Sequence, residues 1–328
     1  KGINMNIVVM GTGGVGGYFG ARLANAGHNV SFIARGKHLE AIKNNGLKII
    51  SETGDILIHP AKVSDNPSDF EIADIILFCV KAFDTESSAK LIKPIVGPKT
   101  AVIPFLNGIG HLEIMKGILG DNNVIGGVAA ISALIEEPGV IRHNSTMQML
   151  KFGEFNNEKT ERVLSFQSAC EESGINNAIP ENINTDMWQK IVMICTLAGA
   201  NCLTRLPLGA CRSNPVTRIL MKNLAEEVVA VAKAENISLP ENQVEMTMKQ
   251  LDSLPEGMKA STLPALEKGE KLEASALNGA IDKLGSKHNI QTYMHKAVYA
   301  ALAPHETVKN KKRAHLRALN IFNYLGRK

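Results

Sequence analysis

A single lysine stands near the start of a long apolar run. The stretch DMWQKIVMICTLAGAN covers residues 186–201, and Lys190 is its only cation. Helical periodicity predicts a helix from about Asp186 to Cys202, with Thr185 as its N-cap. A cation near a helix N-terminus, beside apolar side chains, should have a lowered pKa, as a general acid near neutral pH requires. The alternative is an exposed lysine paired with Asp186, and these facts alone favour neither.

A glycine triplet near the N-terminus is the second pattern with chemical meaning. Gly11, Gly13 and Gly16 follow an expected strand at 7–10 and precede an expected helix at 18–26. In dinucleotide sites the first glycine permits a tight turn, the second admits the pyrophosphate and the third lets the helix pack on the strand. The helix N-terminus also attracts phosphate. We expect a dinucleotide rather than an empty glycine turn, bound by Gly11, Thr12, Gly13, Gly14, Val15 and Gly16.

The end of the next expected strand, at 30–34, indicates which dinucleotide binds. An NAD site usually has Asp or Glu here for the ribose 2′-hydroxyl, whereas an arginine suits the 2′-phosphate of NADP. This chain reads FIARGK, with Arg35 and Lys37, and no acid appears before Glu40. The sequence therefore predicts NADP as cofactor. An Arg35 that simply faces solvent is the competing interpretation.

Two further apolar strands are expected at 75–80 and 101–106, and each ends beside a polar residue. Lys81 follows the first and Asn107 closely follows the second. Ligands of doubly wound sheets lie beyond the carboxyl ends of the strands. Lys81, Asn107 and Arg35 should therefore lie with the glycine loop at one edge of the sheet.

The rest of the chain changes from strands to helices. Residues 123–155 read as two or three long strands that should extend the sheet in antiparallel fashion. Helices are expected at 158–173, 186–202, 215–235, 240–251, 271–288 and 292–301. A length of 328 residues suits two domains. We therefore expect an α/β chain: a Rossmann-type NADP-binding domain at 5–180, then an all-helical substrate and catalytic domain at 181–328.

Bulk composition bears on other classes of function. A net charge of +4 is small for this length and gives no strong argument for nucleic acid. Seven cations but only Glu306 as an acid lie in 305–328, which we interpret as a solvated tail or last helix, with a phosphate or nucleic-acid patch as the alternative. Five cysteines without a C-x-x-C motif indicate reduced thiols in a cytoplasmic protein and no metal site. The longest apolar stretch, 191–203, is too short for a bilayer.

Together these motifs resemble those of a known family, the ketopantoate reductases (2-dehydropantoate 2-reductases). The resemblance covers about 5–304 and rests on the glycine motif, VKAFDT with Lys81, LNGIG with Asn107, MWQK with Lys190, and KASTLPALEKGEKLEASALNG with Ser261 and Glu273. It implies a Rossmann domain and a helical domain with the active site in the cleft between them. It also implies NADPH-dependent reduction of a 2-oxo acid to a 2-hydroxy acid on the route to pantothenate.

The resemblance further implies a role for each matched residue. Lys190 matches the family's catalytic lysine, and Glu273 the acid that supports the lysine and the substrate. Ser261 matches the serine near the substrate carboxylate, while Asn107 and Lys81 match residues at the nicotinamide and substrate end. The arginine of FIARGK matches the cation near the 2′-phosphate. From the residues alone, Ser261 could equally be a helix N-cap, and Glu273 a solvated helix charge.

The chain departs from the family pattern in the substrate region. One and two turns after the lysine, better-known members carry asparagines that touch the substrate, whereas this chain has Ile194 and Ala198. Ketopantoate is the first expected substrate, and a less polar 2-oxo acid is the alternative. A non-catalytic NADP-binding sensor is the third hypothesis, disfavoured because a sensor needs neither Lys190 nor Glu273. The resemblance leaves monomer or homodimer open.

Overall fold

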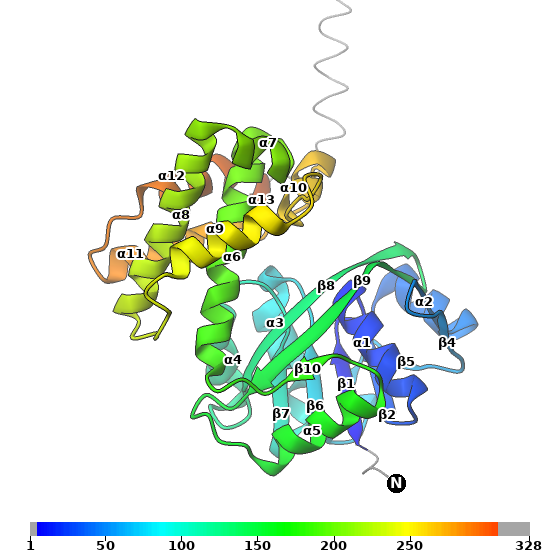
Figure 1. Cartoon of the computed structure of the whole chain (residues 1–328). Helices are drawn as coiled ribbons and strands as arrows, with labels where there is room; N and C mark the ends of the chain where they lie inside the picture. The colour runs from blue at the N-terminus through cyan, green and yellow to red at the C-terminus, as the bar shows by residue number, and fades with distance from the viewer. Residues whose placement is uncertain (1–4, 308–328) are drawn as a thin grey trace, which may run out of the picture. The chain divides into compact units, whose positions relative to one another are not determined.

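The chain divides into two compact units, Lys1–Met187 and Trp188–Lys328. The structure, a computed structural model, describes residues 5–307 (Figure 1). The boundary between the units falls inside one helix, α6 (Ile183–Thr204). The basic residues from Lys309 onward, for which a solvated tail or last helix was expected, lie outside the described residues.

The first unit contains a parallel sheet with the strand order β5-β2-β1-β6-β7. Its strands are β1 (Asn6–Met10), β2 (Asn29–Ile33), β5 (Lys62–Ser64), β6 (Ala73–Phe78) and β7 (Val96–Pro104). Strand β1 lies at the centre, with Ile7 and Val9 buried on one face and Val8 and Met10 buried on the other. Burial on both faces explains why this strand reads as a continuous apolar run. Because the strands are parallel, their carboxyl ends lie at one edge of the sheet.

Helices cover both faces of this sheet. They are α1 (Gly14–Asn25), α2 (Gly36–Asn45), α3 (Thr85–Ile92) and α4 (His111–Leu119). Tyr18 and Phe19 of α1 belong to the core on one face, while Ala89 of α3 and Met115 of α4 belong to the core on the other. Short 3₁₀ turns, η1 (Pro67–Asp69), η2 (Ala82–Asp84) and η3 (Lys93–Ile95), complete the connections. The expected Rossmann-type α/β fold is confirmed.

The long strands after residue 123 do not extend this sheet, and that prediction is wrong. A second sheet has the order β10-β9-β3-β4, with β8 paired to β9 in antiparallel fashion. Its strands are β3 (Leu47–Ser51), β4 (Ile56–Ile58), β8 (Gly126–Glu137), β9 (Val140–Gly153) and β10 (Asn177–Ala178). A side chain at Gly20 of α1 would meet the first sheet at Val9 and Phe32, and one at Gly17 would meet Ile141 of the second. Helix α1 therefore packs between the two sheets. The alternation of apolar residues could not predict this arrangement, because it shows which face of a strand is buried but not which element covers that face.

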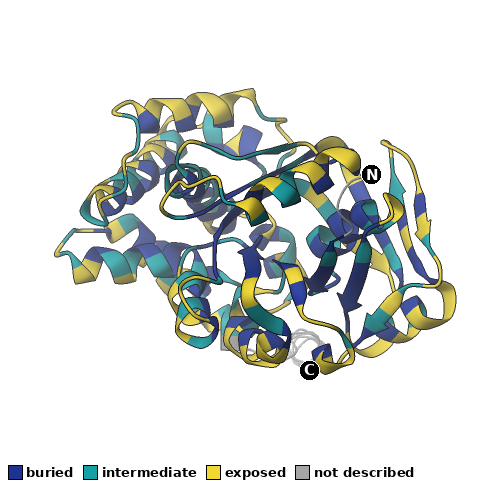
Figure 2. Ribbon diagram, turned by 90° about the horizontal axis from the view of Figure 1, so that it is seen from below, coloured by how far each residue is buried: buried dark blue, intermediate teal, exposed yellow. Residues whose placement is uncertain are grey.

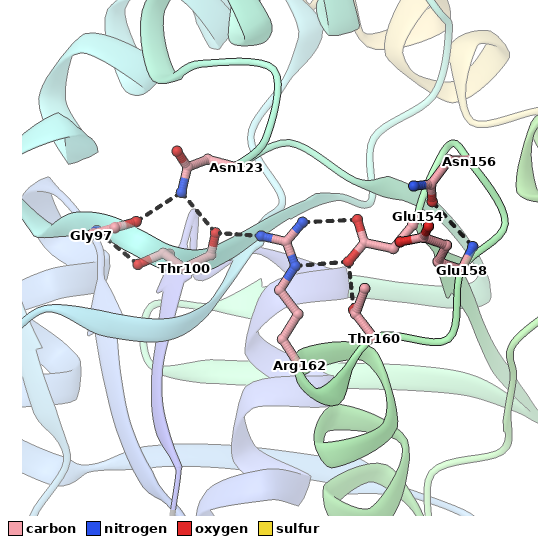
Figure 3. A network of polar contacts seen from close by, with 8 residues as sticks. All are labelled: Gly97, Thr100, Asn123, Glu154, Asn156, Glu158, Thr160 and Arg162. Atoms are coloured by element: carbon pink, nitrogen blue, oxygen red, sulfur yellow. Dashed lines mark hydrogen bonds and ion pairs between the residues drawn. The ribbon is translucent and has the colours of Figure 1, made fainter.

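A polar network anchors β7, β9 and α5 (Glu161–Glu172) in the first unit (Figure 3). The Arg162 guanidinium donates Nε to Oε1 and Nη2 to Oε2 of Glu154, both at 2.8 Å. It also donates to the carbonyl of Thr100 at 3.2 Å, and Asn123 donates to the same carbonyl at 2.9 Å. Glu154 is buried, and the two hydrogen bonds from the guanidinium of Arg162 compensate the charge of its carboxylate. Figure 2 shows the central strands of the parallel sheet as mostly buried and the helices of this unit as buried on one side.

The second unit is helical, as expected. After α6 come α7 (Leu208–Ser213), α8 (Pro215–Ala234), α9 (Gln243–Ser253), α10 (Thr262–Lys268), η4 (Ala274–Ala276), α11 (Asn278–Lys287), α12 (Tyr293–Leu302) and α13 (Pro304–Thr307). One apolar cluster joins α8, α10 and α12 to Cys202 of α6, and another joins α7 and α9 to Leu197 and Ala200. Helix α6 thus contributes residues to both apolar clusters.

Two helix starts differ from the prediction. Helix α6 begins at Ile183, and the side chain of Asn182 accepts hydrogen bonds from the backbone N–H groups of Asn184 and Thr185. Thr185 therefore lies inside the first turn and is not the cap. The helix expected at 271–288 begins only at Asn278, because Leu277 has φ −106° and ψ −102°, which is not helical backbone. Both differences arise from local capping geometry that apolar periodicity does not encode.

Candidate active site

The glycine loop has the shape that a dinucleotide requires. Gly11 has φ +97°, a left-handed conformation that favours glycine. A Cβ at Gly13 would meet nothing within 4 Å, whereas a Cβ at Gly16 would lie 2.3 Å from the carbonyl oxygen of Gly11. Helix α1 has no side-chain cap and no acid in its first turn, so its free backbone N–H groups can donate hydrogen bonds to an anion. The backbone is thus open where a pyrophosphate would approach and close-packed behind, and these residues fit a dinucleotide.

Two side chains fix this loop in place. Thr12 donates its hydroxyl to the carbonyl of Ile33 at 2.9 Å. His38 accepts the backbone N–H of Gly139 at Nδ1, 3.0 Å away, so its Nε2 carries the proton and donates to the carbonyl of Thr12 at 2.8 Å. Burial lowers the pKa of His38, although the hydrogen bond to Thr12 acts to raise it. The imidazole is therefore neutral and ties the loop to the turn between β8 and β9.

No sequence motif points to His38 as a functional residue. It lies in the first turn of α2, and its partner Gly139 is 101 residues away. The only signal was its place shortly after the strand that ends at Ile33, which is where side chains near the cofactor are expected.

The three polar residues expected at the sheet edge do follow the carboxyl ends of neighbouring strands. Arg35 follows β2, Lys81 follows β6 and Asn107 follows β7. Lys81 is exposed and Asn107 is partly buried. The Arg35 side chain is 82% exposed, and its Nη2 donates to Oδ2 of Asp84 at 2.7 Å. Arg35 therefore has a carboxylate partner that the sequence did not indicate.

In the second unit, Lys190 is half-buried on α6. Burial lowers the pKa of its ammonium group to about 8. The carboxylate of Asp186, the partner considered for an exposed lysine, forms an ion pair with Lys151 of β9. The lowered pKa is the property that the sequence pattern predicted for a lysine beside apolar side chains.

Ser261 and Glu273 lie on segments that precede short helices. Ser261 occupies the N-cap position of α10, is exposed and makes no capping hydrogen bond with its side chain. The N-cap alternative for its hydroxyl is therefore not supported. Glu273 is partly buried at the N-cap position of η4, likewise without a capping hydrogen bond.

Two buried asparagines tie these segments to α6. Asn201 accepts the backbone N–H of Ala260, next to Ser261, at 2.8 Å, and donates to the carbonyl of Leu206 at 2.8 Å. Asn278 donates to the carbonyl of Cys195 at 3.2 Å. Both amides are thus used to hold helix α6 against its neighbours.

The two positions that depart from the family pattern are apolar in their surroundings as well as in type. Ile194 is partly buried, and Ala198 is only 1% exposed. Asn201 lies nearby in the chain, but both ends of its amide already have backbone partners. It therefore does not replace the amides that the family carries at the other two positions.

A membrane-spanning helix and a cluster of possible metal ligands are both absent from residues 5–307. No helix there combines the length and the apolar character needed to cross a bilayer. No three His, Cys, Asp or Glu side chains in that range come together as a possible metal site.

Comparison with known proteins supports the fold and identifies the family. Residues 7–157 match the family model for ketopantoate reductase PanE/ApbA, and residues 182–306 match the model for the C-terminal part of the same family. The oxidoreductase YkpB of Bacillus subtilis is 30% identical over 305 residues, which cover 93% of this chain and all of the relative. A 2-dehydropantoate 2-reductase of Mesorhizobium japonicum is 28% identical and covers 86% of this chain and 91% of its own length.

A solved structure gives the same result. The crystal structure of 2-dehydropantoate 2-reductase from Methylococcus capsulatus is 31% identical, with a TM-score of 0.84, and the match covers 94% of this chain and 99% of that one. The glycine loop, the half-buried lysine on α6 and these matches along nearly the whole chain lead to one conclusion. The chain belongs to the ketopantoate reductase family of oxidoreductases.

Proposed function

We propose that this protein reduces a 2-oxo acid to the corresponding 2-hydroxy acid with NADPH, and that 2-dehydropantoate is its first candidate substrate. The proposal assigns dinucleotide binding to the first unit and acid catalysis to Lys190. It is supported by family membership and above all by a half-buried lysine whose pKa burial lowers to about 8. The MWQK motif matches this lysine to the family's catalytic lysine.

The first unit would hold the dinucleotide by its backbone and by cations. Free N–H groups at the start of α1 would bind the pyrophosphate beside Gly13. Arg35, with Lys37, would bind the 2′-phosphate, because a guanidinium pairs well with phosphate oxygens. Asn107 and Lys81 would serve the nicotinamide and substrate end. When bound, the dinucleotide supplies the hydride.

The second unit would supply the proton. Negative charge develops on the carbonyl oxygen of the 2-oxo acid during reduction, and the ammonium group of Lys190 would stabilise that charge and then donate a proton to the oxygen. Glu273 would keep the lysine and the substrate in register. Ser261, whose hydroxyl is exposed and makes no capping bond, would donate to the substrate carboxylate.

Substitution of the lysine tests this assignment. Lys190→Ala should reduce kcat by about 10²- to 10⁴-fold, the usual contribution of a positioned acid, while NADPH binding should remain close to wild type. Oxidation of NADPH followed by absorbance measures the first quantity, and quenching of protein fluorescence measures the second. Lys222→Ala is the matched control, because Lys222 is an exposed lysine of the same unit in an ion pair with Glu226. Wild-type turnover in Lys190→Ala would exclude the mechanism.

A less polar 2-oxo acid is the second candidate substrate, favoured by Ile194 and Ala198. A polar substrate group that finds no partner in an apolar pocket loses affinity and selectivity. A panel of 2-oxo acids, including ketopantoate and analogues without its hydroxyl, would compare kcat/KM values. If ketopantoate gives the highest value, the first candidate stands, and if a less polar acid does, the second stands.

Ile194→Asn should shift that order. An amide at this position should raise kcat/KM for ketopantoate relative to the hydroxyl-free analogue by about two- to tenfold, the range of one hydrogen bond. Ile194→Leu retains the apolar surface and should leave the ratio unchanged. An unchanged ratio in Ile194→Asn would mean that this side chain does not face the substrate hydroxyl.

A further inference from the structure

The ion pair between Arg35 and Asp84 has a place in the fold that bears on cofactor choice. Strands β2 and β6 are the two hydrogen-bonded neighbours of β1. Arg35 follows β2, and Asp84 ends the η2 turn that follows β6. The pair therefore joins the two loops that flank the glycine loop, at the edge of the sheet where a dinucleotide binds.

Asp84 is the more firmly held partner. Its side chain is 25% exposed, compared with 82% for Arg35. Its backbone N–H donates to the carbonyl of Lys81 at 2.8 Å, and the hydroxyl of Ser87 donates to its carbonyl at 3.0 Å. The backbone of Asp84 is therefore held, and its side chain is less exposed than that of Arg35, so the arginine side chain has the greater freedom to move.

The two dinucleotides would meet this carboxylate differently. A 2′-phosphate must compete with Asp84 for the guanidinium of Arg35 and is repelled by the carboxylate charge. A ribose 2′-hydroxyl carries no charge and can donate a hydrogen bond to a carboxylate, which is the role of the acid that NAD sites place after the second strand. The carboxylate missing from the end of β2 is thus supplied by the neighbouring loop.

We infer that Asp84 is a specificity-determining residue that weakens the preference for NADPH over NADH conferred by Arg35. The inference rests on the proposed function, because it requires that the glycine loop bind a nicotinamide dinucleotide. It makes cofactor preference the balance of a cation and an anion on adjacent loops and not the result of Arg35 alone.

Dissociation constants of NADPH and NADH for the full-length protein test the inference. Asp84→Asn should bind NADPH about two- to fivefold more tightly, the range expected for releasing an exposed ion pair, with NADH binding unchanged or weaker. Asp84→Glu keeps the charge and should have a ratio closer to wild type. Glu86→Gln is the matched control. Glu86 lies two residues after Asp84, and its exposed carboxylate pairs with Lys90, so its removal should leave the ratio of the NADPH and NADH dissociation constants unchanged.

The outcomes separate this inference from the proposed function. A ratio unchanged in Asp84→Asn, or weaker NADPH binding in that variant, would overturn the role of Asp84 and leave the reductase intact. Failure of the wild-type protein to bind either dinucleotide would overturn both. Thermal unfolding of each variant shows whether it is folded. A general loss of structure would weaken the binding of both dinucleotides alike and leave the ratio of their dissociation constants unchanged.

Discussion

At the scale of single residues, the proposed role of Lys190 as the acid predicts that the activity depends on pH. A general acid works in its protonated form, and the pKa of Lys190 is lowered by burial to about 8. We expect kcat/KM to fall by about tenfold for each pH unit above that value, as the ammonium group loses its proton. The measurement is kcat/KM from pH 6 to pH 10. In Lys190→Arg, the residual rate should not fall near pH 8, because a guanidinium stays charged; a wild-type rate that is flat to pH 10 would exclude Lys190 as the acid.

Arg35 and His38 should affect cofactor binding in different ways. Arg35→Ala should weaken NADPH binding by about tenfold or more and leave NADH binding nearly unchanged, because only NADPH carries the 2′-phosphate. His38→Ala should weaken both dinucleotides to a similar extent, because His38 holds the glycine loop that would bind the pyrophosphate common to both. Fluorescence titration of each variant measures the two dissociation constants. If Arg35→Ala weakened the binding of NADPH and NADH equally, the 2′-phosphate would not bind at Arg35.

At the scale of elements, the network around Arg162 should contribute strongly to the stability of the first unit (Figure 3). Arg162→Met would leave the buried Glu154 carboxylate without its cation and should reduce the free energy of unfolding by about 3 kcal/mol. Arg142→Met is the matched control, because Arg142 and Glu136 form a solvent-exposed pair whose loss should have a much smaller effect on the free energy of unfolding. Urea unfolding measures both. Equal effects of the two substitutions would contradict the assigned role of burial.

The same network fixes the direction of a pH effect on stability. Burial acts to raise the pKa of Glu154, but hydrogen bonds from Arg162 and Thr160 and the charge of Arg162 outweigh it and lower the pKa. A carboxyl whose folded pKa is depressed stabilises the protein above its unfolded pKa, and this contribution is lost as the pH falls through the folded value. The difference in stability between wild type and Arg162→Met should therefore shrink in acid.

Within the elements, the sequence was informative where a structure is local. Strand β1, the glycine loop and helix α1 were expected because a buried parallel strand reads as an apolar run and the turn after it needs glycines. The second sheet was not expected, because β9 pairs with β3 across a long stretch of chain and packs on α1. Apolar alternation fixes which residues of a strand are buried but carries no information about the strand beside it.

At the scale of the whole molecule, the order of the motifs along the chain was enough to identify the family. The matches to the family models at 7–157 and 182–306 cover most of the same span. The choice of substrate was not determined in this way, since one fold can serve several substrates through a few differing side chains, and we propose Ile194 as one of them.

The sequence by itself determined the α/β and helical character of the two halves, the glycine loop and the candidate lysine, because each depends on residues close together in the chain. Only the tertiary structure decided that Arg35 pairs with Asp84, 49 residues away, and that His38 holds Thr12 and Gly139. It also decided how far Lys190 is buried, and so the value of its pKa. Such contacts join distant segments, and the free energy that selects them comes from packing the whole chain and not from any one stretch of it.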